Sequence, residues 1–191
     1  MVRQMNEPAS DESLMLEVAK GKSDSLEALI RRYSTKLLSF LHRMSGDYHK
    51  GEELFQEVFL AVWCKRGLYE FPRPFKTWLY AIAVNRCRSD FRRTAPLTEP
   101  FAEMNLPESL LGQNSPVTTA MAAEKAVLIG TAVARLPEPQ RIVVVLRIWH
   151  QMSYAEIAQV LNQPDGTVRS HMHRGLCTLR ELLEGRLSQN D

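Results

Sequence analysis

Helical spacing of apolar residues dominates this sequence and limits the folds open to it. Residues 25–44 place their apolar side chains on one broad stripe, and no segment shows a convincing strand-like alternation. Residues 50–66 and 75–93 continue the helical pattern, and the three segments share enough Leu, Phe, Trp and Val to form one core. We therefore predict a first all-helical domain at residues 11–93, preceded by an N-terminal tail at residues 1–10.

A proline-rich segment, residues 94–118, interrupts this pattern. It contains four prolines and no basic residue, which is typical of a mobile linker, although an ordered loop packed on one domain is the alternative. Helical spacing resumes at residues 120–136 and 140–152. We predict a second, smaller domain at residues 119–186 and a C-terminal tail at 187–191. The predicted fold class is all-α, with two small helical domains joined by a flexible linker.

The composition is that of a soluble globular protein, with 45% apolar and 24% charged residues in 191. No apolar run approaches the ~18 residues that span a bilayer, and the N-terminus lacks the apolar region of a secretory signal. We therefore predict a cytoplasmic protein without membrane insertion. Cys64, Cys87 and Cys177 lie far apart without disulfide or metal spacing, and nothing supports redox sensing. His171 and His173 point to different sides of a helix, so we predict neither a metal nor a cofactor.

The net charge of +2 is distributed unevenly. Residues 1–93 carry 16 Lys and Arg against 12 Asp and Glu, residues 94–118 carry none against three, and residues 119–191 carry 8 against 7. The basic charge is therefore local, which suits a protein that touches nucleic acid at selected places.

Residues 153–175 have the pattern of two helices around a tight turn. Ser153 is a good N-cap, and Glu156 three residues later completes a capping box. Asn162 tolerates the left-handed conformation that ends such a helix, and Pro164 suits the first turn of the next one. Two helices joined this tightly form a helix-turn-helix.

The second helix of this pair has an apolar and a polar side. We predict that its apolar side is formed by Val168, Met172, Leu176, Leu179 and Leu183. The opposite side carries Arg169, Ser170, His173, Arg174 and Cys177. Arg and Ser near the start of such a helix can reach base edges and phosphates in the major groove. A solvated face on an ordinary bundle helix is the alternative.

Arginines and aromatic residues gather at the end of the first domain. Residues 85–93 contain four arginines and one aspartate. The aromatic residues just upstream are Tyr69, Phe71, Phe75, Trp78 and Tyr80. Aromatic faces interleaved with arginine suit single-stranded DNA, because any base can stack while the cations follow the phosphates. The alternative is that most of the rings are core residues and that the arginines solubilise a helix end.

An acidic, amide-bearing face formed by Glu52, Glu53, Gln56 and Glu57 lies beside a strong apolar stripe. Acidic residues near a helix N-terminus also interact favourably with the helix macrodipole, so these residues have an alternative explanation that involves no partner. Such a face repels DNA, and we interpret it as a candidate surface for a basic protein partner.

Four blocks of sequence occur together in a specific order. They are EELFQEVFLAVW, FKTWLYAIAVNRCRSDFRR, LPEPQRIVVVLRIWHQMSYAEIAQVL and GTVRSHMHRGLCTLRELL. Together they resemble the extracytoplasmic-function (ECF) group of bacterial RNA polymerase sigma factors, over about residues 11–93 and 119–184. The resemblance implies the two domains commonly named σ2 and σ4, joined by a linker.

The resemblance also implies partners for the faces described above. The acidic helix of σ2 would dock on the clamp helices of the polymerase β′ subunit, which points to Glu53, Gln56 and Glu57. Contact with the polymerase β flap is implied as well. The group is usually held inactive by an anti-sigma factor, so we expect such a partner.

The implied DNA contacts fall on both domains. The −10 element would be read as single strand, with a base captured by the loop at residues 67–74, which contains Tyr69, and by the following helix. The other residues implicated are Trp78, Asn85, Arg88 and Arg92. In σ4 the second helix of the helix-turn-helix would enter the major groove of the −35 element. The implicated residues are Arg169, Ser170, His173 and Arg174, with Arg147 approaching the backbone.

The sequence departs from the family pattern in three places. Asn162 stands where family members often have Gly, and His171 where they often have Arg, which weakens one cation near neutral pH. The two prolines of EFPRPF stiffen the −10 loop, where many relatives have a Gly-Asp or Gly-Ala pair. The preferred promoter bases therefore cannot be transferred from relatives.

These features predict an alternative-sigma transcription initiation factor, without catalytic residues, that directs core polymerase to promoter DNA. Three alternatives stay open. A conventional helix-turn-helix regulator outside polymerase would dimerise on a palindrome. A nucleic-acid enzyme would need paired carboxylates, a phosphate-binding glycine loop or a triad, and the sequence shows none of these patterns. An inactive adaptor of sigma shape is a further alternative.

Overall fold

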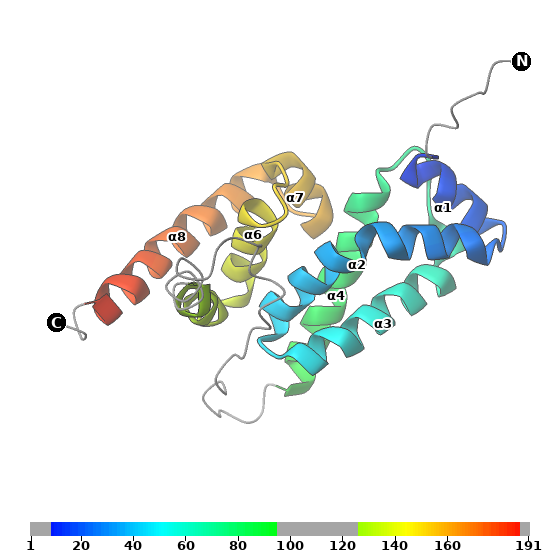
Figure 1. Ribbon diagram of the computed structural model, residues 1–191. Helices are drawn as coiled ribbons and strands as arrows, with labels where there is room; N and C mark the ends of the chain where they lie inside the picture. Colours follow the sequence, from blue (N-terminus) through cyan, green and yellow to red (C-terminus); the bar gives the residue numbers. More distant parts are fainter. Residues whose placement is uncertain (1–8, 95–125, 188–191) are drawn as a thin grey trace, which may run out of the picture.

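The computed structural model describes residues 9–94 and 126–187, and helices are the only regular elements there (Figure 1). This confirms the predicted all-α class. The predicted linker lies almost wholly outside these residues, as do residues 119–125 and both predicted tails apart from a few residues. None of the described helices has the length and apolarity that crossing a bilayer requires.

The first group of helices contains the three predicted segments and two short elements that were not predicted, α1 (Asp11–Ala19) and the 3₁₀ turn η1 (Arg66–Leu68). The predicted segments are α2 (Ser23–Ser45), α3 (Tyr48–Cys64) and α4 (Phe75–Thr94). Ser10 is the N-cap of the short helix α1, and its hydroxyl accepts a hydrogen bond from the Ser13 N–H at 3.1 Å. The Glu12 carboxylate accepts from the Phe75 N–H at 3.1 Å, so α1 caps the start of α4.

The second group contains a helix at residues 126–134, followed by α6 (Glu138–Ile148), α7 (Tyr154–Leu161) and α8 (Asp165–Leu187). The capping box between Ser153 and Glu156 is confirmed, as is the left-handed Asn162 at φ 51°. Pro164 lies just before α8 rather than inside its first turn, and its carbonyl accepts from the Val168 N–H at 3.2 Å. The helix-turn-helix is therefore present as predicted.

The predicted apolar side of α8 is wrong at Leu176, which is 46% exposed. Gly175 faces inwards instead, and a Cβ added there would lie 2.8 Å from Val144 Cγ2. At 100° per residue, position 175 returns to within about 20° of Val168, whereas position 176 lies about 80° away. The glycine allows α8 to approach α6 closely, so a backbone position completes the stripe where the sequence suggested a leucine.

The two groups of helices pack directly against each other, which the sequence did not predict. Helix α4 contacts α7, and α2 contacts α6 (Figure 1). One continuous apolar cluster contains core residues of both groups. Polar contacts cross the same boundary. The Tyr80 hydroxyl and His150 Nδ1 are 2.9 Å apart, and the Arg43 guanidinium lies 4.9 Å from the centre of the Trp149 ring.

Arg141 of α6 is the most buried charged residue at this boundary, with 7% exposure. Its Nη1 donates to the Met44 carbonyl at the end of α2 at 2.9 Å, and its Nη2 donates to the Leu136 carbonyl at 3.1 Å. The guanidinium also lies over the Phe91 ring of α4, 5.4 Å from its centre. One side chain thus joins α2, α4 and the segment that leads into α6.

We predict that Arg141→Met lowers the free energy of unfolding by about 2–4 kcal/mol, because it leaves two buried carbonyl groups without their charged donor. Urea denaturation followed by circular dichroism measures the change. Arg135→Met, at an exposed arginine of the same segment, serves as the matched control and should change stability by less than about 0.5 kcal/mol. Equal stabilities of the two variants would contradict the role given to Arg141.

We also predict a pH-dependent stability that depends on His150. Burial lowers its pKa to about 4, helped by the positive charges of Arg43, Lys76 and Lys36. As pH falls from about 6.5 to 4, the unfolded chain takes up a proton at this residue that the folded chain does not, so stability falls. This one residue should remove roughly 2 kcal/mol of folding free energy between pH 7 and pH 5.

Urea denaturation at both pH values checks this prediction. His150→Asn cannot titrate and should lose less stability than the wild type on acidification, by that same amount. His49→Asn, at an exposed histidine, should retain the wild-type pH dependence. If His150→Asn loses as much stability as the wild type between pH 7 and pH 5, His150 is not the source of this pH dependence.

Candidate nucleic-acid interface

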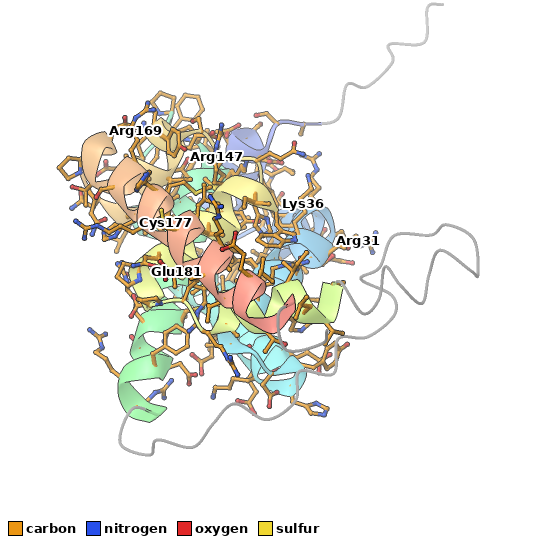
Figure 2. All side chains as sticks on the ribbon, turned by 90° about the vertical axis from the view of Figure 1, so that its left-hand side faces the viewer. Arg31, Lys36, Arg147, Arg169, Cys177 and Glu181 are labelled. Atoms are coloured by element: carbon orange, nitrogen blue, oxygen red, sulfur yellow. The ribbon has the colours of Figure 1, made fainter. Side chains whose placement is uncertain are left out.

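The outer face of α8 presents the side chains that the sequence assigned to duplex DNA. Arg169, His173 and Arg174 are exposed and Ser170 is half-buried. Figure 2 looks onto this face and shows Arg169 near the start of α8, with Cys177 and then Glu181 further along the same helix. The first turns of α8 therefore offer cations and hydrogen-bonding groups to a partner, as reading a major groove requires.

Tyr154, the first residue of α7, fixes two arginines of this face and was missed by the sequence analysis. The Arg147 and Arg169 guanidinium groups lie 5.0 and 4.5 Å from the centre of its ring. Arg147 also donates to the Met152 carbonyl at 2.9 Å, and Arg169 donates to Asp165 Oδ2 at 2.6 Å. The ring thus contacts both Arg147, which was predicted to approach the DNA backbone, and Arg169, which was predicted to enter the major groove. No spacing rule in the sequence indicates such a ring between two cations.

Asn85, Arg88 and Arg92 share one side of α4, at the spacing i, i+3, i+7. Asn85 and Arg92 are exposed. Arg88 is half-buried, and its Nε donates to Glu138 Oε1 of α6 at 2.9 Å. In this arrangement Glu138 of the second group of helices therefore pairs with Arg88, the central cation of the predicted −10 face.

The aromatic residues of this region divide into core and surface. Tyr69, Phe75, Trp78 and Tyr80 are buried, which confirms that most of them are core residues. The Tyr69 and Trp78 rings meet edge to face with centres 5.3 Å apart, and the Tyr69 hydroxyl donates to the Arg73 carbonyl. Burial raises the pKa of Tyr69 to about 12. A role for Tyr69 or Trp78 in base capture stays a prediction.

The loop before α4 exposes a different ring. Phe71 is 59% exposed, and Leu68 of η1 is 73% exposed. The peptide bond between Phe71 and Pro72 is cis. Of the rings around this loop, Phe71 is the one whose face is accessible to a base in this arrangement. The sequence analysis placed it among the aromatic residues without singling it out.

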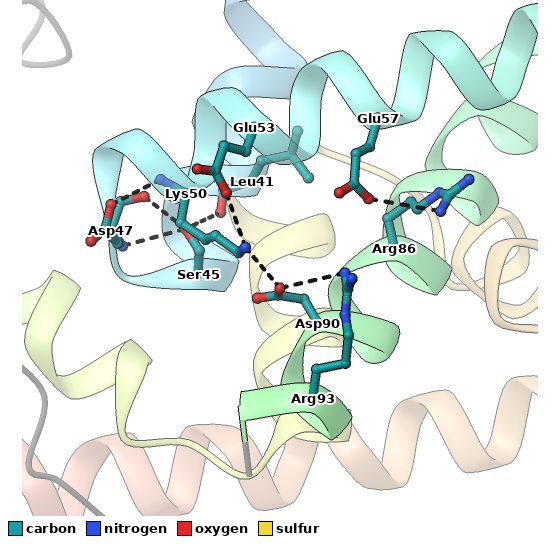
Figure 3. Close-up of polar contacts among 9 residues, drawn as sticks. All are labelled: Leu41, Ser45, Asp47, Lys50, Glu53, Glu57, Arg86, Asp90 and Arg93. Atoms are coloured by element: carbon teal, nitrogen blue, oxygen red, sulfur yellow. Dashed lines mark hydrogen bonds and ion pairs between the residues drawn. The ribbon is translucent and has the colours of Figure 1, made fainter. Parts of the chain in front are cut away.

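The acidic face of α3 is largely exposed, and two of its carboxylates form ion pairs with neighbouring basic residues. Glu53 and Gln56 are exposed and Glu57 is half-buried. Lys50 Nζ lies 3.0 Å from Glu53 Oε2, and Arg86 Nη1 of α4 lies 3.7 Å from Glu57 Oε2 (Figure 3). Exposed pairs of this kind contribute little to stability, so a partner can displace them at small cost.

Two further residues extend this surface. Lys50 also lies 3.0 Å from Asp90 Oδ1, which connects α3 to the arginine-bearing end of α4 (Figure 3). Leu60 follows Gln56 by one turn of α3 and is 63% exposed. The face that the sequence described as acidic therefore ends in an apolar side chain, as protein-binding surfaces often do.

Comparison with known proteins identifies both groups of helices. Residues 29–96 match the family model for sigma-70 region 2, and residues 126–179 match that for sigma-70 region 4. The ECF RNA polymerase sigma factor SigW of Bacillus subtilis is 32% identical, covering 87% of this chain and 93% of its own length. The chain belongs to the sigma-70 family, in its extracytoplasmic-function group.

Other relatives agree with this assignment. The ECF RNA polymerase sigma-E factor of Escherichia coli K12 is 30% identical over 89% of this chain and 92% of its own. Two solved structures share the fold. CnrH, in complex with the cytosolic domain of CnrY, has a TM-score of 0.67 at 23% identity and covers 93% of this chain and 99% of its own. The sigma factor RpoE of Bartonella quintana, in complex with the anti-sigma factor NepR, has a TM-score of 0.69 at 21% identity and covers 83% and 96%.

The ion pair between Arg88 and Glu138 should weaken the binding of single-stranded DNA by this sigma factor, because it neutralises Arg88. Glu138→Gln removes the charge that holds Arg88 and should raise the affinity of the free protein for a mixed-sequence single-stranded oligonucleotide by roughly two- to fivefold, the range of a partly exposed ion pair. Fluorescence anisotropy of a labelled oligonucleotide measures the change.

A double-mutant cycle supplies the control. Arg88→Gln should weaken binding, and in that background Glu138→Gln should have no further effect. An equal gain with and without Arg88 would show that Glu138 acts through general charge instead.

Proposed function

We propose that this ECF sigma factor binds core RNA polymerase and directs it to specific promoters. The observation that supports this most is that a sigma-70 region 2 match is followed by a region 4 match in the same chain. In the region 4 match, the outer face of the helix-turn-helix exposes Arg169, His173 and Arg174. We place the σ2 domain at residues 11–93 and the σ4 domain at residues 119–186.

The two domains would divide promoter recognition between them. The outer face of α8 would read the −35 duplex, with Arg147 on the phosphate backbone beside Arg169. On σ2, Asn85, Arg88 and Arg92 would follow the unpaired −10 strand. The loop at residues 67–74 would capture a base, which offsets an unstacking cost of a few kcal/mol.

Polymerase binding would use the exposed helix of σ2. Glu53, Gln56 and Glu57 form the surface for the β′ clamp helices, and Leu60 adds an apolar contact. We propose that σ4 contacts the β flap. Because polymerase supplies much of the affinity, the free protein should bind promoter duplex poorly.

An anti-sigma factor is the partner that we propose to hold this protein inactive. The two similar structures were solved with CnrY and with the anti-sigma factor NepR bound to those proteins. We also propose that the protein acts in the cytoplasm, where its polymerase acts, and that it has no catalytic activity of its own.

The main proposal is tested by transcription of fragmented genomic DNA with purified core polymerase, with and without this protein. New RNA 5′ ends that share two spaced upstream motifs are the expected result. Arg169→Ala should reduce these transcripts about 10- to 100-fold, the usual loss for one base contact. Arg180→Ala, at an exposed arginine further along α8, is the matched control and should leave them unchanged.

Active core polymerase without new starts would overturn the proposal. The protein would then be examined as a conventional regulator, by measuring dimerisation and binding to palindromic duplex.

A further inference from the structure

A polar cavity of about 530 Å³ lies between the two packed domains. Its walls come from α1, α2 and α4 on one side and from the connection between α6 and α7 on the other. The full lining of the cavity therefore requires both σ2 and σ4. Its volume falls in the range of small-molecule sites, and it contains none of the side chains assigned above to promoter or polymerase.

The charge around this cavity is predominantly positive. Arg32, Lys36 and Lys76 line it, with Asp11 as the one carboxylate. The Asp11 carboxylate is already engaged, since its Oδ1 accepts from Arg32 Nη1 at 2.7 Å and its Oδ2 accepts from the Tyr33 hydroxyl at 2.5 Å. One negative charge is thus shared among several donors, and a net positive potential remains.

The two lysines have little else to bind. Lys36 is exposed and makes no ion pair within residues 9–94 and 126–187. Lys76 Nζ lies 3.8 Å from Glu156 Oε1, a long distance for a hydrogen bond. The other oxygen of Glu156 accepts from the Ser153 N–H at 2.7 Å, as the capping box requires. Both ammonium groups therefore keep donors for a ligand.

The neutral state of His150 agrees with this positive potential. Burial lowers its pKa, and Arg43, Lys76 and Lys36 lower it further. Its Nδ1 meets the Tyr80 hydroxyl, and within the described part of the chain its buried Nε2 has no hydrogen-bond partner. Burial disfavours a charge of either sign, whereas the positive charges of Arg43, Lys76 and Lys36 favour an anion in this space.

We propose that this cavity binds a small anion with two or more phosphate groups, held between Lys36 and Lys76 with help from Arg32. Several cations around one space suit a multiply charged anion, and phosphate oxygens accept charge-assisted hydrogen bonds from ammonium and guanidinium groups. The volume admits a nucleoside polyphosphate as well as free pyrophosphate. Because residues 149–151 of the second domain form one wall, a ligand that also contacts them stabilises the packed arrangement by mass action.

Isothermal titration calorimetry of the full chain tests this, with ATP, inorganic pyrophosphate and adenosine as probes in EDTA. We expect ATP to bind with 1:1 stoichiometry and adenosine to give no heat. The affinity of pyrophosphate relative to ATP distinguishes a free polyphosphate from a nucleotide as the ligand.

Matched variants locate the site. Lys36→Gln and Lys76→Gln should each weaken ATP binding about tenfold, the loss of one charge-assisted contact. Lys65→Gln, at an exposed lysine that follows α3, should bind as the wild type does. Absence of binding by both ATP and pyrophosphate at millimolar concentration overturns the proposal, as does equal weakening by all three substitutions. Neither result would bear on promoter recognition, which the transcription experiment tests separately.

Discussion

The buried guanidinium of Arg141 is the interaction on which the arrangement of this protein depends. It joins the carbonyl of Met44 at the end of α2 to the Leu136 carbonyl before α6, and it lies over the Phe91 ring of α4. A buried cation is costly unless its donors are satisfied, so these contacts favour one relative position of the three elements. In that position Tyr80 also meets His150, and core residues of σ2 and σ4 join in one continuous apolar cluster.

This arrangement affects the two faces that we propose for DNA binding differently. The outer face of α8 is open, and Tyr154 holds Arg147 and Arg169 side by side on it. On σ2, by contrast, Arg88 is paired with Glu138 of the other domain. We infer that separation of the domains would release the −10 face while leaving the −35 face largely unchanged. The acidic surface on α3 lies away from this boundary, so polymerase could reach it in the packed arrangement.

Much of the local structure could be predicted because it depends on neighbours in the sequence. The helix-turn-helix followed from Ser153, Glu156 and Asn162, whose capping roles involve residues at most a few positions away. Helix α1 was missed because nine residues carry too short a periodic signal. Leu176 was misplaced because the four-residue spacing was extended too far, and the contact of Gly175 with Val144 corrects it. Of the candidate site, the exposed polar side chains of α3, α4 and α8 were predicted as surface, whereas the burial of Tyr69 and Trp78 depends on packing between segments.

Spacing along the chain was sufficient to specify the all-helical class, the approximate helix limits and the helix-turn-helix, whereas the family followed from the resemblance of four sequence blocks to known members. Short-range hydrogen bonds and side-chain periodicity translate such spacing directly into structure. Only the packing between distant segments shows that the two domains share one core and that Glu138 forms an ion pair with Arg88. The same packing shows that Lys36 and Lys76 line one cavity with His150. The partners in each of these pairings lie on different elements, far apart in the sequence. The geometry of packed helices, and no local rule, therefore determines which of these side chains meet.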